Sequence, residues 1–236
     1  MKIETADIAY RDGEARLTGF LAVDSSRSGR RPGVLVIHGG AGLDDHARGR
    51  ARRFAEEGFV GFACDMYGDG VIGNRERTMS AIQRLRTDRE ALMRRVQPAL
   101  DVLRSHDQVD GRIAAVGYCF GGMVVLELAR AGARIDGAVS VHGNLTTAVS
   151  APPSIHAKIL VCHGALDPHA PMTQVLTFAE EMKQAAADYH LIVYGSAMHG
   201  FTHEHATVQQ NGVLYDAQSD ARSSAAIRSF FSELFE

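Results

Sequence analysis

The sequence predicts an α/β fold built on a mostly parallel, doubly wound sheet. From Pro32 onward, short continuous apolar runs alternate with amphipathic segments, which is typical of buried parallel strands joined by crossover helices. One run, Ile113 to Val116, leads directly into a cysteine bracketed by glycines, the pattern of a sharp turn from a strand into a helix. Strands that alternate with helices place a functional site beyond the carboxyl ends of the strands.

Eight segments read as strands. The opening is an antiparallel hairpin, in which 4–10 and 15–23 are joined through Arg11-Asp12-Gly13-Glu14. A polar connector follows, and then come the buried strands of the parallel part. These are Val34 to His38, Val60 to Asp65, Ile113 to Gly117, Gly137 to His142, Ile159 to His163 and His190 to Tyr194.

Helices fill the segments between the strands. Asp44 or Asp45 caps a helix that ends at Gly58, and Thr87 or Asp88 starts another that runs through Leu103. The helix behind the bracketed cysteine is apolar nearly all round, as expected for a buried helix. Pro171 stands where the first residue of a helix belongs. A last helix runs from about residue 216 to 235, with Ala217, Ala221, Ile227, Phe230, Phe231 and Leu234 expected to face inward.

Length, composition and charge fit one domain over residues 1–236. The chain is 45% hydrophobic and 22% charged, which is ordinary for a globular protein with a substantial core. The formal net charge of -3 and the lack of blocks of like charge give no general attraction to nucleic acid or to anionic membranes. We therefore expect a small-molecule partner, no nucleic acid, no membrane, and a monomer or dimer.

The N-terminus and the cysteines predict a cytoplasmic protein with reduced thiols. The first residues are too polar for a signal peptide, and no stretch approaches eighteen apolar residues. An odd number of cysteines, three, argues against a disulfide framework. Cys64 and Cys162 lie in or at the end of apolar runs without glycines around them, so both are expected in the core.

Cys119 is the candidate nucleophile. It stands in Gly117-Tyr118-Cys119-Phe120-Gly121-Gly122, a nucleophile elbow with cysteine where serine is usual. Flanking glycines are needed there because a Cβ would collide with the turn. The alternative is a buried core cysteine, the commonest role of this residue type, and the glycines on both sides favour the nucleophile.

Asp167 and His199 are the candidate partners of Cys119. Each follows a predicted strand, so their side chains are expected at the same edge of the sheet, in the chain order nucleophile, carboxylate, histidine. The alternatives are a turn or cap residue for Asp167 and a loop histidine satisfied by its surroundings for His199. An oxyanion requires two backbone donors. We expect these from Phe120 and from Gly40, with Ala41 next, although the His38-to-Gly42 loop also fits a plain tight turn.

The Gly-x-Cys-x-Gly-Gly elbow, the Gly-x-x-Asp turn and the His-Gly-Phe loop resemble the dienelactone hydrolase family, from Pro32 to Phe235. The resemblance implies an α/β-hydrolase fold of about eight strands with an N-terminal antiparallel hairpin and helices on both faces. It also implies a triad of Cys119, Asp167 and His199 that hydrolyses an ester or lactone through an acyl-thiol intermediate, without a cofactor.

Two positions depart from the family pattern. The family carries a glutamate after its third strand, where this chain has His38-Gly39-Gly40, and an arginine four residues after the catalytic histidine, where this chain has His203. A second family arginine corresponds to Arg75 or Arg77. Dienelactone itself is therefore not the expected substrate. The expected pocket residues are His38, Gly39, Ala41, Tyr118, His142, His203 and Arg75. For His38 and His142, which each end a strand, satisfaction of local backbone groups is favoured over lining the pocket.

A sulfur nucleophile favours activated substrates. A thiolate leaves a tetrahedral intermediate more readily than an alkoxide does, so enol lactones, aryl esters and thioesters should react faster than alkyl esters. The alternatives are an acyltransferase or thioesterase with the same triad, and a ligand-binding protein with weak or no turnover. The histidines of segment 199–205 lack the His-Glu-x-x-His spacing, so no metal site is predicted.

Overall fold

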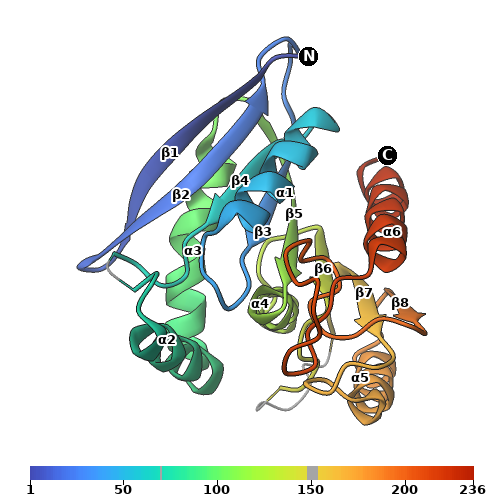
Figure 1. Ribbon diagram of the computed structural model, residues 1–236. Helices are drawn as coiled ribbons and strands as arrows, with labels where there is room; N and C mark the ends of the chain where they lie inside the picture. Colours follow the sequence, from blue (N-terminus) through green and yellow to red (C-terminus); the bar gives the residue numbers. More distant parts are fainter. Residues whose placement is uncertain (70, 148–153) are drawn as a thin grey trace. The chain divides into compact units, whose positions relative to one another are not determined.

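The strands of the protein form an eight-stranded sheet in the order β1-β2-β4-β3-β5-β6-β7-β8 (Figure 1). The computed structural model describes residues 1–69, 71–147 and 154–236. The predicted α/β fold with a mostly parallel sheet is confirmed. Two compact units divide the chain, Met1–Ala115 and Val116–Glu236, and the boundary falls within β5 (Val109–Tyr118). No helix among the described residues has the length and apolar character needed to cross a membrane.

The first unit opens with the predicted hairpin. β1 (Ile3–Asp12) and β2 (Ala15–Asp24) pair in antiparallel register, and the turn between them contains Gly13 at φ 58°. The two strands form the long twisted ribbon drawn in blue in Figure 1. β2 then pairs with β4 (Val60–Cys64), again antiparallel, so the hairpin extends the edge of the sheet.

Parallel pairing begins with β3 (Arg31–Ile37) beside β4. Every residue of both strands is buried, so both of their faces are covered. The helices that contact them are α1 (Asp45–Glu56) and α3 (Arg89–Ser105). Cys64 is completely buried at the end of β4, as its apolar run predicts. Such continuous burial is what a strand between two helical layers requires.

The helix caps of this unit follow the sequence. The Asp44 side chain accepts the N–H of Ala47 at 3.0 Å, and the Asp88 side chain accepts the N–H of Ala91 at 2.8 Å. A helix that the sequence analysis did not predict, α2 (Arg75–Thr87), lies between them in the chain. Its only buried residue is Leu85, so it lacks the apolar periodicity by which the others were recognised.

The second unit continues the parallel sheet with β6 (Gly137–Val141), β7 (Lys158–Gly164) and β8 (Tyr189–Tyr194). Helix α4 (Phe120–Arg130) is buried along its whole length, as predicted. Its last residue, Arg130, is therefore paired. The guanidinium donates to Glu127 at 2.9 Å and to both carboxylate oxygens of Glu181 at 2.7 Å. A charge this deep is tolerated because each polar group has a partner.

Several predicted bounds and faces are corrected by the structure. β5 begins at Val109 rather than Ile113, because its polar first residues interrupt the apolar run. Pro171 is the N-cap of α5 (Met172–Gln184) and not its first residue. In α6 (Ala217–Phe235), Ala217 and Ala221 are exposed. The buried residues near its start are Ser219, Asp220 and Ser223. The N–H of Ser219 donates to the Asp216 side chain, and the Ser223 hydroxyl donates to the carbonyl oxygen of Asp220, so these polar groups are paired where they are buried.

Candidate active site

Cys119 occupies a strained turn between a strand and a helix. β5 ends at Tyr118, α4 begins at Phe120, and the residue between them has φ 53° and ψ -113°. A non-glycine residue in such a sparsely populated conformation costs about 1–3 kcal/mol, and the conformation persists only where the surrounding structure holds it. The Cys119 side chain is partly exposed, whereas Cys64 and Cys162 are completely buried. Of the three thiols, this one is presented at a bend.

Glycines hold this turn together. A Cβ added to Gly117 would lie 1.9 Å from the carbonyl oxygen of Gly121, and one added to Gly122 would lie 2.7 Å from Cα of Gly143. Neither clash can be relieved by a side-chain movement, because the opposing atoms belong to the backbone. The glycines around Cys119 are therefore required by the close approach of strand, turn and helix.

The structure brings Cys119, His199 and Asp167 into one hydrogen-bonded chain. Nε2 of His199 lies 3.0 Å from Sγ of Cys119, and Nδ1 of His199 lies 2.8 Å from Oδ2 of Asp167. Asp167 follows β7 and His199 follows β8, so both come from loops at the carboxyl ends of parallel strands. With the Nδ1 proton donated to the carboxylate, Nε2 faces the sulfur and can exchange a proton with it.

Asp167 serves the turn and the histidine at once. Its side chain is completely buried, and Oδ1 accepts the backbone N–H groups of His169 at 2.8 Å and Ala170 at 3.1 Å. Burial alone would raise the pKa of this carboxyl group. The hydrogen bond and charge of His199, together with the two backbone donors, instead lower it. The turn role and the contact with His199 thus coexist in one side chain.

The surroundings of His199 favour its charged form. Burial opposes the charge, but hydrogen bonds with Asp167 and Cys119 and the negative charges of these groups raise the pKa of the imidazole to about 10. The ring is also packed edge-on against two other histidines, with centroid separations of 4.9 Å to His169 and 5.4 Å to His142. A positive imidazolium beside the Cys119 sulfur is the arrangement that favours a thiolate.

A short segment clamps the two loops that carry Asp167 and His199. His199 donates its N–H to Gly212 and accepts the N–H of Leu214, at 3.1 and 3.2 Å. Gly212, at φ 76°, packs so closely on Pro168 that a Cβ there would lie 2.1 Å from the proline ring. The sequence analysis missed this clamp, because isolated bridges carry no apolar periodicity. A glycine beside Asn211 was the one local signal.

The sequence also matches a known protein family. The model of the dienelactone hydrolase family matches residues 17–235. The chain belongs to the dienelactone hydrolase family. It is therefore a hydrolase of the lactone and ester class.

Individual family members cover most of the chain. A dienelactone hydrolase-like promiscuous phosphotriesterase from metagenomic libraries has a crystal structure with a TM-score of 0.94, 39% identity and 100% coverage of both chains. A probable 2-oxo-3-(5-oxofuran-2-ylidene)propanoate lactonase of Bradyrhizobium is 28% identical, covering 82% of each chain. A putative carboxymethylenebutenolidase of Yersinia pestis is 25% identical over 83% of this chain and 80% of its own.

The other expected site residues of the second unit surround the elbow. Phe120 is the first residue of α4, at the helix end where backbone N–H groups lack intrahelical acceptors. Tyr118 is buried, and its ring centroid lies 6.1 Å from that of His142. His203, where the family has an arginine, is half-buried with its ring 5.5 Å from His142. His142 is buried and accepts a hydrogen bond from the backbone N–H of Cys119. It therefore fits the role of satisfying a local backbone group better than that of lining a pocket.

The expected site residues of the first unit form a separate hydrogen-bonded loop. His38 is completely buried, with Nδ1 2.7 Å from the carbonyl oxygen of Gly39 and Nε2 accepting the N–H of Met66 at 3.1 Å. The Tyr67 hydroxyl donates to the carbonyl oxygens of Gly39 and Gly40. Ala41 is exposed beside them. The loop is thus fixed within its unit, and the roles of Gly39, Gly40 and Ala41 toward Cys119 stay predictions.

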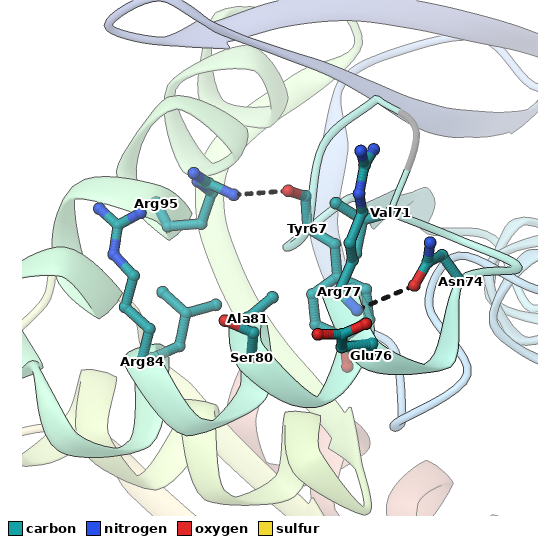
Figure 2. Close-up of a pocket in the computed structure, with 10 residues that line it drawn as sticks. Tyr67, Val71, Asn74, Glu76, Arg77, Ser80, Ala81, Arg84 and Arg95 are labelled. Atoms are coloured by element: carbon teal, nitrogen blue, oxygen red, sulfur yellow. Dashed lines mark hydrogen bonds between the residues drawn. The ribbon is translucent and has the colours of Figure 1, made fainter.

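A cleft of about 620 Å³ opens in the first unit (Figure 2). Its lining includes three arginines and one carboxylate, together with polar and apolar side chains: Arg77, Arg84, Arg95, Glu76, Tyr67, Asn74, Ser80, Val71, Ala81 and Leu85. Figure 2 shows Arg95 donating to the carbonyl oxygen of Tyr67, and Arg95 also pairs with Asp12 at 2.9 Å. Arg75 is the exposed first residue of α2 and does not line this cleft. Of the two arginines that the family resemblance suggested, Arg77 faces the cavity.

No group of three or more His, Cys, Asp or Glu side chains within 1–69, 71–147 and 154–236 is arranged to hold a metal ion. The rings of His142 and His169 each pack edge to face on the ring of His199.

Proposed function

We propose that this protein hydrolyses small activated esters or lactones with Cys119 as nucleophile, His199 as general base and acid, and Asp167 as the group that orients His199. The observation that carries the proposal is the unbroken chain of contacts, 2.8 Å from Asp167 to His199 and 3.0 Å from His199 to Sγ of Cys119. These distances are the ones that nucleophile activation requires. The strained elbow supplies the exposed sulfur.

The reaction proceeds in two halves. The Cys119 thiolate, paired with the His199 imidazolium, attacks the substrate carbonyl carbon to give a tetrahedral oxyanion. As the C–O bond of the leaving group breaks, Nε2 of His199 gives its proton to the departing oxygen, and an acyl-thiol remains. A water molecule then attacks the acyl carbon while Nε2 takes its proton. The C–S bond breaks, releasing the carboxylic acid and the thiolate.

Two backbone donors are assigned to the oxyanion. Phe120 follows the nucleophile and begins α4, so its N–H belongs to the positive end of the helix dipole. Gly40 is proposed as the second donor. The Tyr67 hydroxyl bonds the carbonyl oxygens of Gly39 and Gly40, and these bonds fix the orientation of the peptide planes that carry the N–H groups of the loop. Loss of one such donor typically costs about a hundredfold or more in kcat.

The sulfur nucleophile also limits the substrate. Because a thiolate is a better leaving group than an alkoxide, attack on an alkyl ester mostly reverts before the alcohol departs. Enol lactones, aryl esters and thioesters carry leaving groups that compete with sulfur. We expect p-nitrophenyl acetate to turn over faster than ethyl acetate by a wide margin. Equal turnover of the two esters would contradict a thiolate in this role.

One relative favours a second activity. Because a family member 39% identical to this chain is a promiscuous phosphotriesterase, we propose that Cys119 also attacks activated phosphotriesters. The new S–P bond would form as the aryloxide leaves, and water would then cleave that bond. Release of nitrophenolate from diethyl p-nitrophenyl phosphate by the wild type, lost in Cys119→Ala, is the expected result. Release that persists in the variant would exclude Cys119 as the group that attacks the phosphotriester.

Trapping the acyl-enzyme tests the proposal directly. Wild-type protein mixed with p-nitrophenyl acetate and quenched in acid should carry one acetyl group, located on the peptide that contains Cys119. Cys119→Ala should carry none, whereas Cys64→Ala, which removes a buried thiol of the core, should be labelled like the wild type. Labelling without release of acetate would identify a binding protein. Faster release on addition of alcohols or amines would identify an acyltransferase.

A further inference from the structure

His142 follows β6 and contacts both loops that carry the reacting groups. Cys119 shares its backbone N–H between Nδ1 of His142 at 3.1 Å and the carbonyl oxygen of Val141 at 3.0 Å. Nε2 of His142 lies 2.9 Å from Oγ1 of Thr202. Thr202 belongs to the same loop as His199. Both His142 and Thr202 are completely buried. One side chain thus joins the backbone of the nucleophile to the loop of the base.

We propose that His142 is a positioning residue that keeps Sγ of Cys119 and Nε2 of His199 at hydrogen-bonding distance. The inference rests on the proposed function, because positioning has meaning only if this pair performs the chemistry. His142 acts through two groups, the N–H of Cys119 and the hydroxyl of Thr202. Its ring would therefore set the separation of two loops that come from different strands.

The hydrogen bonds fix which nitrogen of His142 carries the proton. The N–H of Cys119, which it shares with the carbonyl oxygen of Val141, lies against Nδ1, so Nδ1 presents a lone pair to it. The proton of the neutral ring then lies on Nε2, which donates to Thr202. A second proton on the ring would set two donors against each other at Nδ1. The arrangement therefore selects one neutral tautomer of His142, while His199 is left to carry the proton of the reaction.

The backbone around His142 is held as tightly as its ring. The residue has φ 41°, a left-handed conformation in which histidine is less disfavoured than most residues. Its N–H donates to the carbonyl oxygen of Cys162 at 2.8 Å, which ties it to β7. The next residue, Gly143, lies so close to the start of α4 that a Cβ there would be 2.7 Å from the carbonyl carbon of Gly122. His142 is thus a fixed point from which the two loops are positioned.

His142 and Asp167 restrain His199 in different ways. Asp167 bonds Nδ1 and so fixes the rotation and tautomer of the ring. His142 holds the loop through Thr202, and its ring packs against Phe201 at a centroid distance of 5.1 Å, nearly perpendicular. A displacement of about 1 Å in such a pair can cost a hundredfold in rate. The two restraints together define where Nε2 meets the sulfur.

Matched substitutions separate this role from packing. Thr202→Val removes the hydroxyl and keeps the volume, whereas Thr202→Ser keeps the hydroxyl. His142→Asn keeps an acceptor near the N–H of Cys119 and tolerates positive φ, but is too short to reach Thr202. The double variant His142→Asn/Thr202→Val shows whether the two residues act together. Should His142→Asn fail to fold, the two Thr202 variants still decide the matter.

Two readouts are measured for each variant. The first is kcat and KM for p-nitrophenyl acetate, and the second is the rate of Cys119 alkylation by iodoacetamide across pH. Thr202→Val and His142→Asn should each lower kcat about ten- to a hundredfold at unchanged KM. Their alkylation profiles should shift toward that of an isolated thiol, as the sulfur loses its aligned imidazolium. Thr202→Ser should restore both readouts, and the double variant should be no worse than the poorer single variant.

The outcomes distinguish the two levels of the proposal. Unchanged kcat and an unchanged alkylation profile in Thr202→Val and His142→Asn would overturn the positioning role, even if both variants melt at a lower temperature. Wild type, Cys119→Ala and His199→Ala are measured alongside. If wild-type turnover survives in Cys119→Ala, the proposed function fails, and the positioning role fails with it. If turnover is lost in Cys119→Ala and His199→Ala but is unchanged in Thr202→Val, only the positioning role is overturned.

Discussion

Asp167 accepts the Nδ1–H of His199 at 2.8 Å through one carboxylate oxygen and binds the backbone of its own turn through the other. The two oxygens therefore have separate tasks. Oδ1 shapes the turn that precedes α5, and Oδ2 orients the imidazole. An amide in place of the carboxylate would preserve the first task and reverse the second, because one of its two polar atoms is a donor.

Asp167→Asn is expected to abolish most of the activity while leaving the fold intact. If the amide oxygen keeps the turn, the amide NH₂ faces Nδ1 of His199 and forces the proton onto Nε2, where it blocks acceptance from the thiol. The kcat for p-nitrophenyl acetate should fall by about three to four orders of magnitude, as in other triads that hold the wrong tautomer. Asp101→Asn, an exposed carboxylate of α3, is the matched control and should retain full activity. A nearly wild-type kcat in Asp167→Asn would remove Asp167 from the triad.

Gly117→Ala is expected to destabilise the protein strongly. Its Cβ would meet the carbonyl oxygen of Gly121 at 1.9 Å, so the elbow backbone must shift. We expect the free energy of unfolding to fall by about 3 kcal/mol or more, measured by urea unfolding. Gly49→Ala is the control, since nothing lies within 4 Å of its Cβ and it sits within α1. That substitution should stabilise by about 0.5–1 kcal/mol. Equal effects of the two substitutions would show that the elbow is not tightly packed.

The stability of the protein should depend on pH through His199. Its folded pKa, about 10, exceeds its ordinary value of 6.5, so its contribution to stability is fully present below about pH 6.5 and is lost as the pH rises through about 10. The groups that face its ring are Cys119, Asp167, His142 and His169. Because Cys119 gives up its proton when it pairs with the His199 imidazolium, the folded pair holds an extra proton only above about pH 8.5, where a free thiol loses its own. The free energy of unfolding should therefore decline between about pH 8.5 and 10 more steeply for the wild type than for His199→Gln. Parallel curves for the two proteins would contradict the raised pKa.

The elements that the sequence predicted well are those with a local signal. Asp44 and Asp88 cap helices as expected, and the glycines around Cys119 mark the elbow because only glycine fits there. Helix α2 was missed because it is exposed along nearly all its length. The buried face at the start of α6 was predicted wrongly. Alanine was taken to mark that face, but a serine such as Ser223 can be buried there instead, because its hydroxyl hydrogen-bonds to the backbone of its own helix.

The site likewise has residues that the sequence could predict and contacts that it could not. Chain order and strand ends sufficed to pick Cys119, Asp167 and His199 as partners, because parallel strands end at one edge of a sheet. The contacts of His142 could not be predicted. They depend on the left-handed φ of His142, directly after β6, and on the contact of its ring with the side chain of Thr202. Neither feature produces a periodic or compositional pattern in the sequence. That the whole chain forms one domain stays a prediction, as do the monomeric or dimeric state and the cytoplasmic location.

The most direct test of the central claim is stopped-flow kinetics with p-nitrophenyl acetate on wild type, Cys119→Ala and His199→Ala. If the 3.0 Å contact between Nε2 of His199 and Sγ of Cys119 is the catalytic pair, the wild type should release a burst of nitrophenolate close to one equivalent and then turn over steadily. Cys119→Ala should show neither phase, and His199→Ala should lose steady turnover. Steady turnover that persists in Cys119→Ala would contradict the account.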